Sequence, residues 1–152
     1  CISVFLIRNN GEEYSLEIFI LILLICIFTD LGGYIIGKLI KGPIVSKISP
    51  NKTYSGVFGS FLFSIAVTFL ALNFTVFFNN LSTNQFTLYL LTIFLSLVSQ
   101  IGDFTVSYFK RLAKIKDTGK LIPGHGGILD RIDGMLFAFP AYYFISIFYQ
   151  IS

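Results

Sequence analysis

Residues 16–37 read LEIFILILLICIFTDLGGYIIG, an almost unbroken apolar run. An α-helix rises about 1.5 Å per residue, so about 20 such residues cross the hydrocarbon core of a bilayer. The run therefore predicts a transmembrane helix. Further apolar segments follow at residues 57–78, 86–109 and 135–151. The last is short and contains Pro140, so we expect it to be kinked or to extend beyond these bounds.

The composition of the 152-residue chain agrees with a membrane protein. Hydrophobic residues make up 55 % of it and charged residues 12 %, and the mean hydropathy is +0.80. A soluble domain carries about 25 % charged residues, so a water-facing globule fits poorly, as do a disordered chain and a disulfide scaffold. We predict an all-α fold, a polytopic transmembrane helical bundle with a cytoplasm-facing polar chamber, in a single membrane domain over residues 1–152.

The beginning of the chain and its cysteines carry less information. The chain lacks an initiator Met and opens on an apolar stretch, residues 1–7, which we interpret as the tail of a truncated span. We therefore expect the C-terminal part of a longer protein. Cys26 lies inside an apolar run, and we expect it to pack in the core because no metal-type cysteine spacing is present.

Basic residues are distributed very unevenly between the predicted loops. Ten of the 11 Lys and Arg residues fall in two segments, residues 38–56 and 110–134. The connection at residues 79–85 carries no charge. By the positive-inside rule, both basic segments face the cytoplasm. This topology accounts for most of the net charge of +3, so no nucleic acid is needed to explain it.

Two aspartates lie inside the apolar spans. Asp30 and Asp103 precede basic residues by eight and seven positions, which is about 10–12 Å along a helix. A carboxylate within a span is costly, so both are expected to line a polar pocket open to the cytoplasm, with bundle packing as the alternative. Glycines flank both residues, which suits close approach of either a helix or a ligand.

The second basic segment concentrates the chemistry. Residues 107–134 read SYFKRLAKIKDTGKLIPGHGGILDRIDG. Asp130 and Asp133 are spaced i, i+3, so on a helix they share one face, and such paired oxygen ligands suit Mg²⁺. The glycines at 124, 126 and 127 allow backbone N–H groups to approach a phosphate. Carboxylates for metal beside lysines and arginines for phosphate favour phosphoryl or nucleotidyl transfer.

The first basic segment contains ISPNKTYSG at residues 48–56. Its Ser, Lys and Thr side chains, next to a proline turn, are suited to hold phosphates at the start of the following helix. An ordinary helix N-cap explains the same residues equally well.

Residues 107–133 resemble the signature of the phosphatidate cytidylyltransferase (CDP-diacylglycerol synthase) family. The signature reads approximately Ser-x-x-Lys-Arg-x4-Lys-Asp-x-Gly-x-x-x-Pro-Gly-His-Gly-Gly-x-x-Asp-Arg-x-Asp, and this chain matches it position by position. The resemblance extends to residues 102–103, 49–53 and 29–33. Family members often have Lys in place of Asn51 and Trp-Glu-Gly in place of residues 54–56, and they carry additional N-terminal spans.

The resemblance implies that the substrates CTP and phosphatidate react to give CDP-diacylglycerol and pyrophosphate. It implies Mg²⁺ as the cofactor and the lipid bilayer as a further partner. It further implies an enzyme of the bacterial inner membrane, with its active site facing the cytoplasm and a homodimer as an open option. The metal ligands would be Asp103, Asp130 and Asp133. Lys110 and Asp117 would complete the catalytic set, Asp117 by binding metal or orienting a base. The substrate-binding residues would be Ser49, Lys52, Thr53, Arg111, Lys116, His125, Gly126, Gly127 and Arg131.

Two points of chemistry remain open in this scheme. The attacking phosphate is already ionised, so His125 is expected to contact phosphate or pyrophosphate rather than act as a base, with a structural hydrogen bond as the alternative. No role follows for Asp30.

Other functions share parts of this pattern. A lipid kinase, or a cytidylyltransferase with another lipid phosphate as acceptor, would need the same metal and phosphate ligands. A CDP-alcohol phosphotransferase is excluded because Met135-Leu-Phe-Ala-Phe replaces its further aspartates. A transporter could use the intramembrane aspartates but has no evident need for residues 110–133, and a purely structural scaffold needs none of these groups.

Overall fold

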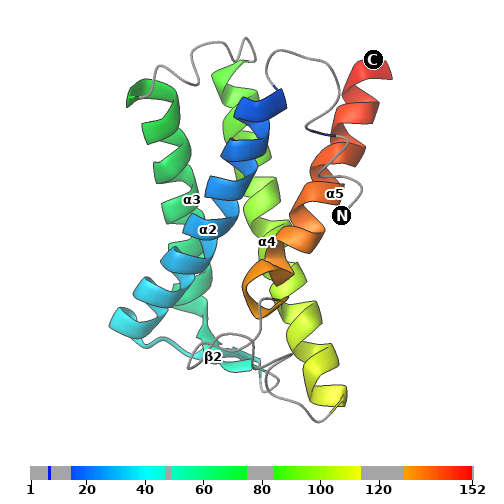
Figure 1. The fold of residues 1–152 in the computed structure, drawn as a ribbon. Coiled ribbons are helices and arrows are strands. Elements are labelled where there is room, and N and C mark those ends of the chain that lie inside the picture. The colour runs from blue at the N-terminus through cyan, green and yellow to red at the C-terminus, as the bar shows by residue number, and fades with distance from the viewer. Residues whose placement is uncertain (1–6, 8–14, 47–48, 75–83, 114–128, 152) are drawn as a thin grey trace.

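Four long helices and one β-hairpin form the part of the chain that the structure describes, residues 7, 15–46, 49–74, 84–113 and 129–151. In this computed structural model the helices are α2 (Ser15–Ile40), α3 (Tyr54–Phe74), α4 (Gln85–Leu112) and α5 (Leu129–Ile151). The strands are β1 (Ile44–Ser46) and β2 (Ser49–Thr53). Figure 1 shows successive helices running in opposite directions, with the hairpin at the end of the bundle where α2 and α4 finish and α3 begins.

The predicted bundle of apolar helices is confirmed. The segments Leu16–Ile40, Tyr54–Asn73 and Gln85–Leu112 are long and apolar enough to cross a membrane. Helix α5 contains a shorter apolar segment, Asp133–Phe148; it begins before the predicted bound and continues through Pro140. Large apolar side chains point outward, such as Phe58 at 67 % exposure and Phe148 at 72 %, as expected for surfaces that contact lipid.

Glycines bring α2 and α3 into backbone contact. A Cβ at Gly32 would lie 2.5 Å from the Gly59 carbonyl oxygen, and one at Gly33 would lie 2.7 Å from Ser60 Oγ. Neither position has room for a side chain. In lipid, where no hydrophobic force draws helices together, close contact through small residues supplies packing energy. Of the two explanations open for the glycines after Asp30, the structure supports helix packing.

The interior combines an apolar cluster with pairs of buried hydroxyl groups. Leu21, Ile25 and Cys26 of α2 pack with Leu95 of α4 and are at most 1 % exposed, which confirms the predicted packing role of Cys26. Thr29 Oγ1 donates to Ser96 Oγ at 3.0 Å, so α2 is also joined to α4 by a hydrogen bond. Thr68 and Thr92 join α3 to α4 in the same way at 3.0 Å. Such pairs satisfy polar groups that the bilayer cannot hydrate.

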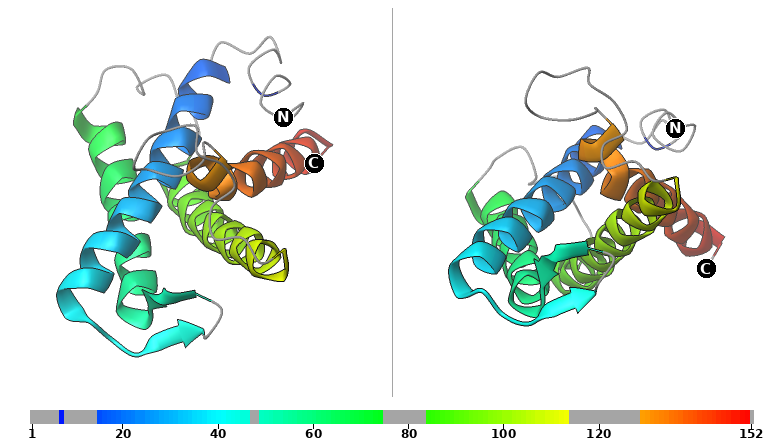
Figure 2. Two further views of the ribbon diagram at one scale, coloured as in Figure 1. Left: turned by 60° about the horizontal axis from the view of Figure 1, so that its bottom comes forward. Right: turned by 90° about the horizontal axis from the view of Figure 1, so that it is seen from below.

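The hairpin corrects the prediction that the segment between the first two spans is only a loop. Its strands are antiparallel, with Ile44 opposite Thr53 and Ser46 opposite Ser49. The sequence gives little sign of a strand here, because Ser49–Thr53 has no apolar alternation and contains a proline. Figure 2 shows the hairpin lying across the ends of α2 and α3, where it brings β2 toward α4.

Candidate functional site

An ion pair joins the hairpin to α4. Lys52 Nζ of β2 lies 3.2 Å from Asp103 Oδ2, and the two side chains are 27 % and 19 % exposed. The ammonium group also lies 4.2 Å from the centre of the Phe104 ring. Partial burial strengthens both contacts relative to a pair in open water. Lys52 is therefore held beside a carboxylate that follows it by 51 residues in the chain.

A second lysine and aspartate meet where α4 faces α5. Lys110 Nζ lies 3.9 Å from Asp133 Oδ2, and these side chains are 13 % and 9 % exposed. The backbone N–H of Gly134 donates to Asp133 Oδ1 at 3.0 Å, which fixes the carboxylate near the first turns of α5. Lys52 thus pairs with an aspartate of α4, and Lys110 pairs with an aspartate of α5.

Glycine contacts bring α4 and α5 close enough to form this site. A Cβ at Gly134 would collide with Ser99 Oγ and would lie 3.1 Å from Asp103 Oδ1. A Cβ at Gly102 would lie 2.7 Å from the Phe137 ring. Because neither glycine carries a side chain, α4 and α5 lie close enough for Asp103 and Asp133 to line one cavity.

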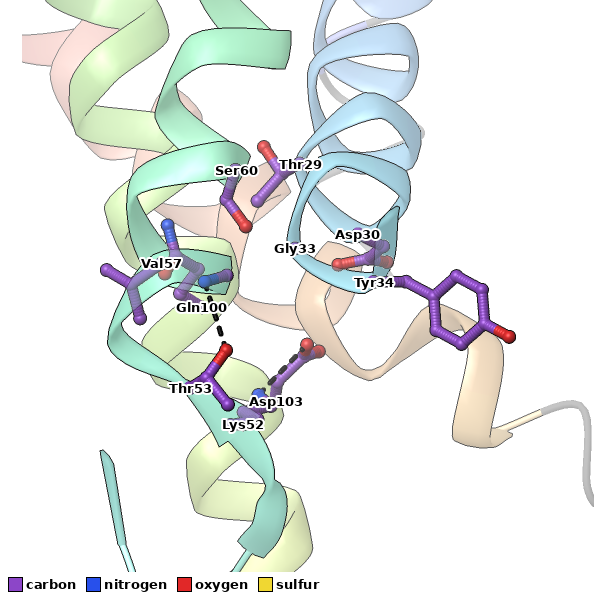
Figure 3. A pocket seen from close by; sticks show the side chains of 11 residues that line it. Thr29, Asp30, Gly33, Tyr34, Lys52, Thr53, Val57, Ser60, Gln100 and Asp103 are labelled. Atoms are coloured by element: carbon purple, nitrogen blue, oxygen red, sulfur yellow. Dashed lines mark hydrogen bonds and ion pairs between the residues drawn. The ribbon is translucent and has the colours of Figure 1, made fainter. Parts of the chain in front are cut away.

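Two cavities open around these residues. The α3-side cavity, of about 200 Å³, lies between α2, α3, α4 and β2; its polar lining includes Thr29, Asp30, Lys52, Thr53, Ser60, Gln100 and Asp103. The α5-side cavity, of about 480 Å³, is lined by Asp30, Lys52, Asp103, Ser107, Lys110 and Asp133, with apolar neighbours. Figure 3 shows the α3-side cavity, with the Lys52–Asp103 pair at one end of it. Asp30, Lys52 and Asp103 belong to both cavities.

Asp30 occupies a central position among these charges. Its carboxylate is repelled by Asp103 and Asp133 and attracted by Lys52. Asp30 and Asp103 line the same cavities, as predicted. That these cavities open toward the cytoplasm stays a prediction.

The carboxylate oxygens suit a hard cation such as Mg²⁺. Asp103 Oδ1 is buried and has no hydrogen-bond partner among the described residues, so it retains a lone pair for a ligand. The described side chains contain no group of three acidic, His or Cys residues close enough to hold a metal. A third protein ligand would have to come from elsewhere. Asp130 precedes Asp133 by one helical turn in α5, but its side chain lies outside the description.

The remaining predicted site residues fall into three groups. Thr53 Oγ1 accepts a hydrogen bond from the Gly56 N–H at 3.2 Å and thus caps α3, and Arg111 is exposed at the end of α4. Ser49 lies in β2 and Arg131 in α5, with side chains outside the description. The last group lies outside the described residues altogether: Lys116, Asp117, His125, Gly126 and Gly127.

Sequence reasoning missed Gln100, one turn before Asp103 in α4. Its Nε2 is buried and has no hydrogen-bond partner among the described residues, and the side chain lines the α3-side cavity. A signal was present, because Gln100 is an amide inside an apolar span beside Gly102 and Asp103. Ser60, which lines the same cavity, was also missed, and Thr29 was noted only within the resemblance over residues 29–33.

The fold and the site define a polytopic α-helical membrane protein with lysines and aspartates gathered around cavities near one end of its bundle. The chain belongs to the cytidylyltransferase family, whose model matches residues 1–149.

Curated relatives of the chain include three staphylococcal proteins named phosphatidate cytidylyltransferase. The chain is 43 % identical to the one from Staphylococcus epidermidis over 134 residues. It is 42 % identical over the same length to those from Staphylococcus haemolyticus and Staphylococcus aureus. These alignments cover 88 % of the chain and 48 % of each relative. The chain thus spans about half the length of the curated relatives it matches.

Proposed function

We propose that the protein transfers the cytidylyl group of CTP to phosphatidate and releases pyrophosphate, forming CDP-diacylglycerol. The observation that carries the proposal is the convergence of Lys52, Lys110, Asp103 and Asp133 at the α5-side cavity in a membrane-type bundle. Family membership and the names of the relatives support the same reaction.

In this reaction a phosphate oxygen of phosphatidate forms a bond to the α-phosphorus of CTP. The bond from that phosphorus to the bridging oxygen of the β-phosphate breaks, and pyrophosphate leaves with the electron pair. The attacking phosphate is already ionised, so no side chain needs to remove a proton. The main difficulty is electrostatic, because two anions must meet, and fixed positive charge reduces this barrier.

The lysines are placed to supply that charge. Lys52 lies on the boundary of both cavities, and Lys110 lies in the α5-side cavity alone. Each is held beside a carboxylate before substrate arrives, so little rearrangement is needed when phosphate groups enter. We assign the phosphates of both substrates to the α5-side cavity.

Asp103 and Asp133, with Asp130 from the same face of α5, are the proposed ligands of Mg²⁺. When bound, this ion would neutralise triphosphate charge and polarise the reacting phosphoryl group. Oδ1 of Asp103, which has no hydrogen-bond partner in the part of the chain that the structure describes, supports this assignment.

We further propose that the hairpin end of the bundle faces the cytoplasm and that the protein resides in a bacterial inner membrane. The basic residues 38, 41, 110 and 111 lie at this end, in agreement with the positive-inside rule. CTP is a cytoplasmic substrate in this scheme, so the chamber would receive it directly. A homodimer remains a prediction.

The test is pyrophosphate release by the purified protein in detergent micelles. Release should require CTP, phosphatidate and Mg²⁺ together. Asp130→Asn should abolish it while the protein still elutes as a folded species. Release from CTP without phosphatidate, or full activity of the folded Asp130→Asn variant, would contradict the proposal.

A further inference from the structure

The proposed reaction leaves two polar groups of the α3-side cavity without a task. Asp30 of α2 lines this cavity and is not among the proposed Mg²⁺ ligands. Gln100 of α4 also lines this cavity, and its Nε2 is buried with no hydrogen-bond partner among the described residues. Figure 3 shows the two residues on opposite sides of the cavity. A buried donor without a partner is costly, which points to a ligand that supplies an acceptor.

The α3-side cavity offers a phosphate group fewer cations than the α5-side cavity does. Of its lining residues only Lys52 is basic, whereas Lys52 and Lys110 both line the α5-side cavity. The lining also includes the apolar side chain of Val57 and hydroxyl groups from Thr29, Tyr34, Thr53 and Ser60. A neutral, polar ring fits such surroundings better than a phosphate group does.

The hydrogen-bonding pattern identifies the ring more closely. Asp30 presents an acceptor on one side, and Gln100 Nε2 presents a donor on the other. The ligand edge must therefore carry a donor at one end and an acceptor at the other. Cytosine has this edge, with its amino group at C4 and its carbonyl oxygen at C2, and carboxylates are known acceptors for the cytosine amino group.

We propose that the α3-side cavity binds the cytosine base of CTP, with Asp30 accepting from the C4 amino group and Gln100 donating to the C2 carbonyl oxygen. This inference rests on the proposed function. The phosphates would then cross the boundary formed by Lys52 and Asp103 into the α5-side cavity, where Lys110 and Asp133 lie.

The two residues have different effects on base selectivity. Uracil keeps the C2 carbonyl but replaces the amino group with a second carbonyl, whose oxygen would face the Asp30 carboxylate. Asp30 is therefore the residue that discriminates against UTP, because two acceptors repel each other. Gln100 contacts an atom that both bases share, so it contributes affinity without selectivity.

The experiment measures how unlabelled CTP and UTP displace radiolabelled CTP from the purified protein in detergent micelles with Mg²⁺. The unsubstituted protein should prefer CTP. Asp30→Asn, whose amide can donate to the uracil carbonyl, should reduce this preference by about tenfold or more. Gln100→Leu should weaken both nucleotides to a similar extent and leave their ratio unchanged.

Asn73→Leu is a matched control for loss of an amide, since Asn73 lies at the far end of α3 and its Nδ2 donates to the Phe69 carbonyl. It should leave both affinities unchanged. An unchanged CTP-to-UTP ratio in folded Asp30→Asn would overturn the inference. If selective CTP binding persists but no pyrophosphate is released with phosphatidate, the proposed reaction fails and the base site stands.

Discussion

At the scale of single residues, Lys52 connects the two cavities, because its side chain lines both of them. Lys52→Gln should lower kcat/KM for CTP by about 100-fold, because a positioned charge that stabilises a transition state contributes on this scale. The measurement is steady-state pyrophosphate release at saturating phosphatidate.

Lys38→Gln is the matched control for this change. Lys38 is exposed at the end of α2, where its Nζ lies 3.4 Å from the Tyr34 hydroxyl and outside both cavities. It should retain near-normal kinetics. Equal losses in the two variants would indicate a general effect of surface charge instead of a role for Lys52.

Asp103 permits a test of metal binding that does not depend on turnover. Asp103→Asn replaces one carboxylate oxygen with an amide nitrogen that cannot bind a cation, so affinity for Mn²⁺ should fall at least about tenfold. Electron paramagnetic resonance of Mn²⁺ added to the purified protein would measure this. Unchanged affinity in the folded variant would remove Asp103 from the ligand set.

The residues that carry charge were largely predictable, whereas their partners were not. Asp103, Asp133, Lys52 and Lys110 stand out in the sequence because charge within or beside an apolar span is costly. The pairing of Lys52 with Asp103, 51 residues apart, depends on how the hairpin lies against α4, and no local sequence pattern encodes that arrangement. Gln100 escaped notice because an amide in a span carries no charge and belongs to no recognised metal or phosphate pattern.

At the scale of helices, the contact of α5 with α4 depends on Gly134. Gly134→Ala would place a methyl group against Ser99 and 3.1 Å from Asp103 Oδ1, so the helices must separate. Overpacking of this kind costs about 1–3 kcal/mol, which lowers the unfolding midpoint by roughly 3–10 °C. Thermal unfolding in detergent should show this fall, accompanied by loss of activity as Asp133 moves away from Asp103.

Ala66→Leu is a control for added volume, because Ala66 is exposed on α3 beside other outward apolar residues. It should leave both the midpoint and the activity unchanged. A Gly134→Ala variant as stable and active as the parent would show that α5 does not need this close approach.

The start of α3 supplies a second test at this scale. Thr53→Val removes the hydroxyl that caps the helix, so stability should fall by about 1 kcal/mol, and Thr53→Ser should restore it. Chemical unfolding in detergent can compare the three proteins. No loss in Thr53→Val would mean that the cap contributes little to folding of the hairpin and α3.

The helices themselves follow from elementary properties of the sequence, because apolar runs of this length have few alternatives in a bilayer. The hairpin does not, since Ser49–Thr53 lacks the alternation that marks a strand, and pairing with β1 depends on tertiary contacts. The glycines of α2 and α4 were recognised as sites of close approach, but their partners became evident only from the packed helices.

At the scale of the whole molecule, the proposed topology places the hairpin end in the cytoplasm. With Cys1→Ser and Cys26→Ala as background, Asn84→Cys at the start of α4 should react with a membrane-impermeant maleimide in intact spheroplasts. Lys41→Cys, beside the hairpin, should react only after the membrane is opened. The reverse labelling pattern would show that the hairpin end lies outside the cytoplasm. The site would then have no access to cytoplasmic CTP.

The fate of the phosphorus atoms of CTP distinguishes cytidylyl transfer from phosphoryl transfer. The purified protein would be supplied with Mg²⁺, phosphatidate and CTP labelled at either the α- or the γ-phosphorus, and the lipid would then be extracted. If the protein transfers the cytidylyl group, the α label should enter the lipid as CDP-diacylglycerol, and the γ label should be recovered as pyrophosphate. Transfer of the γ label to lipid would identify a kinase, and the cytidylyltransferase account would be wrong.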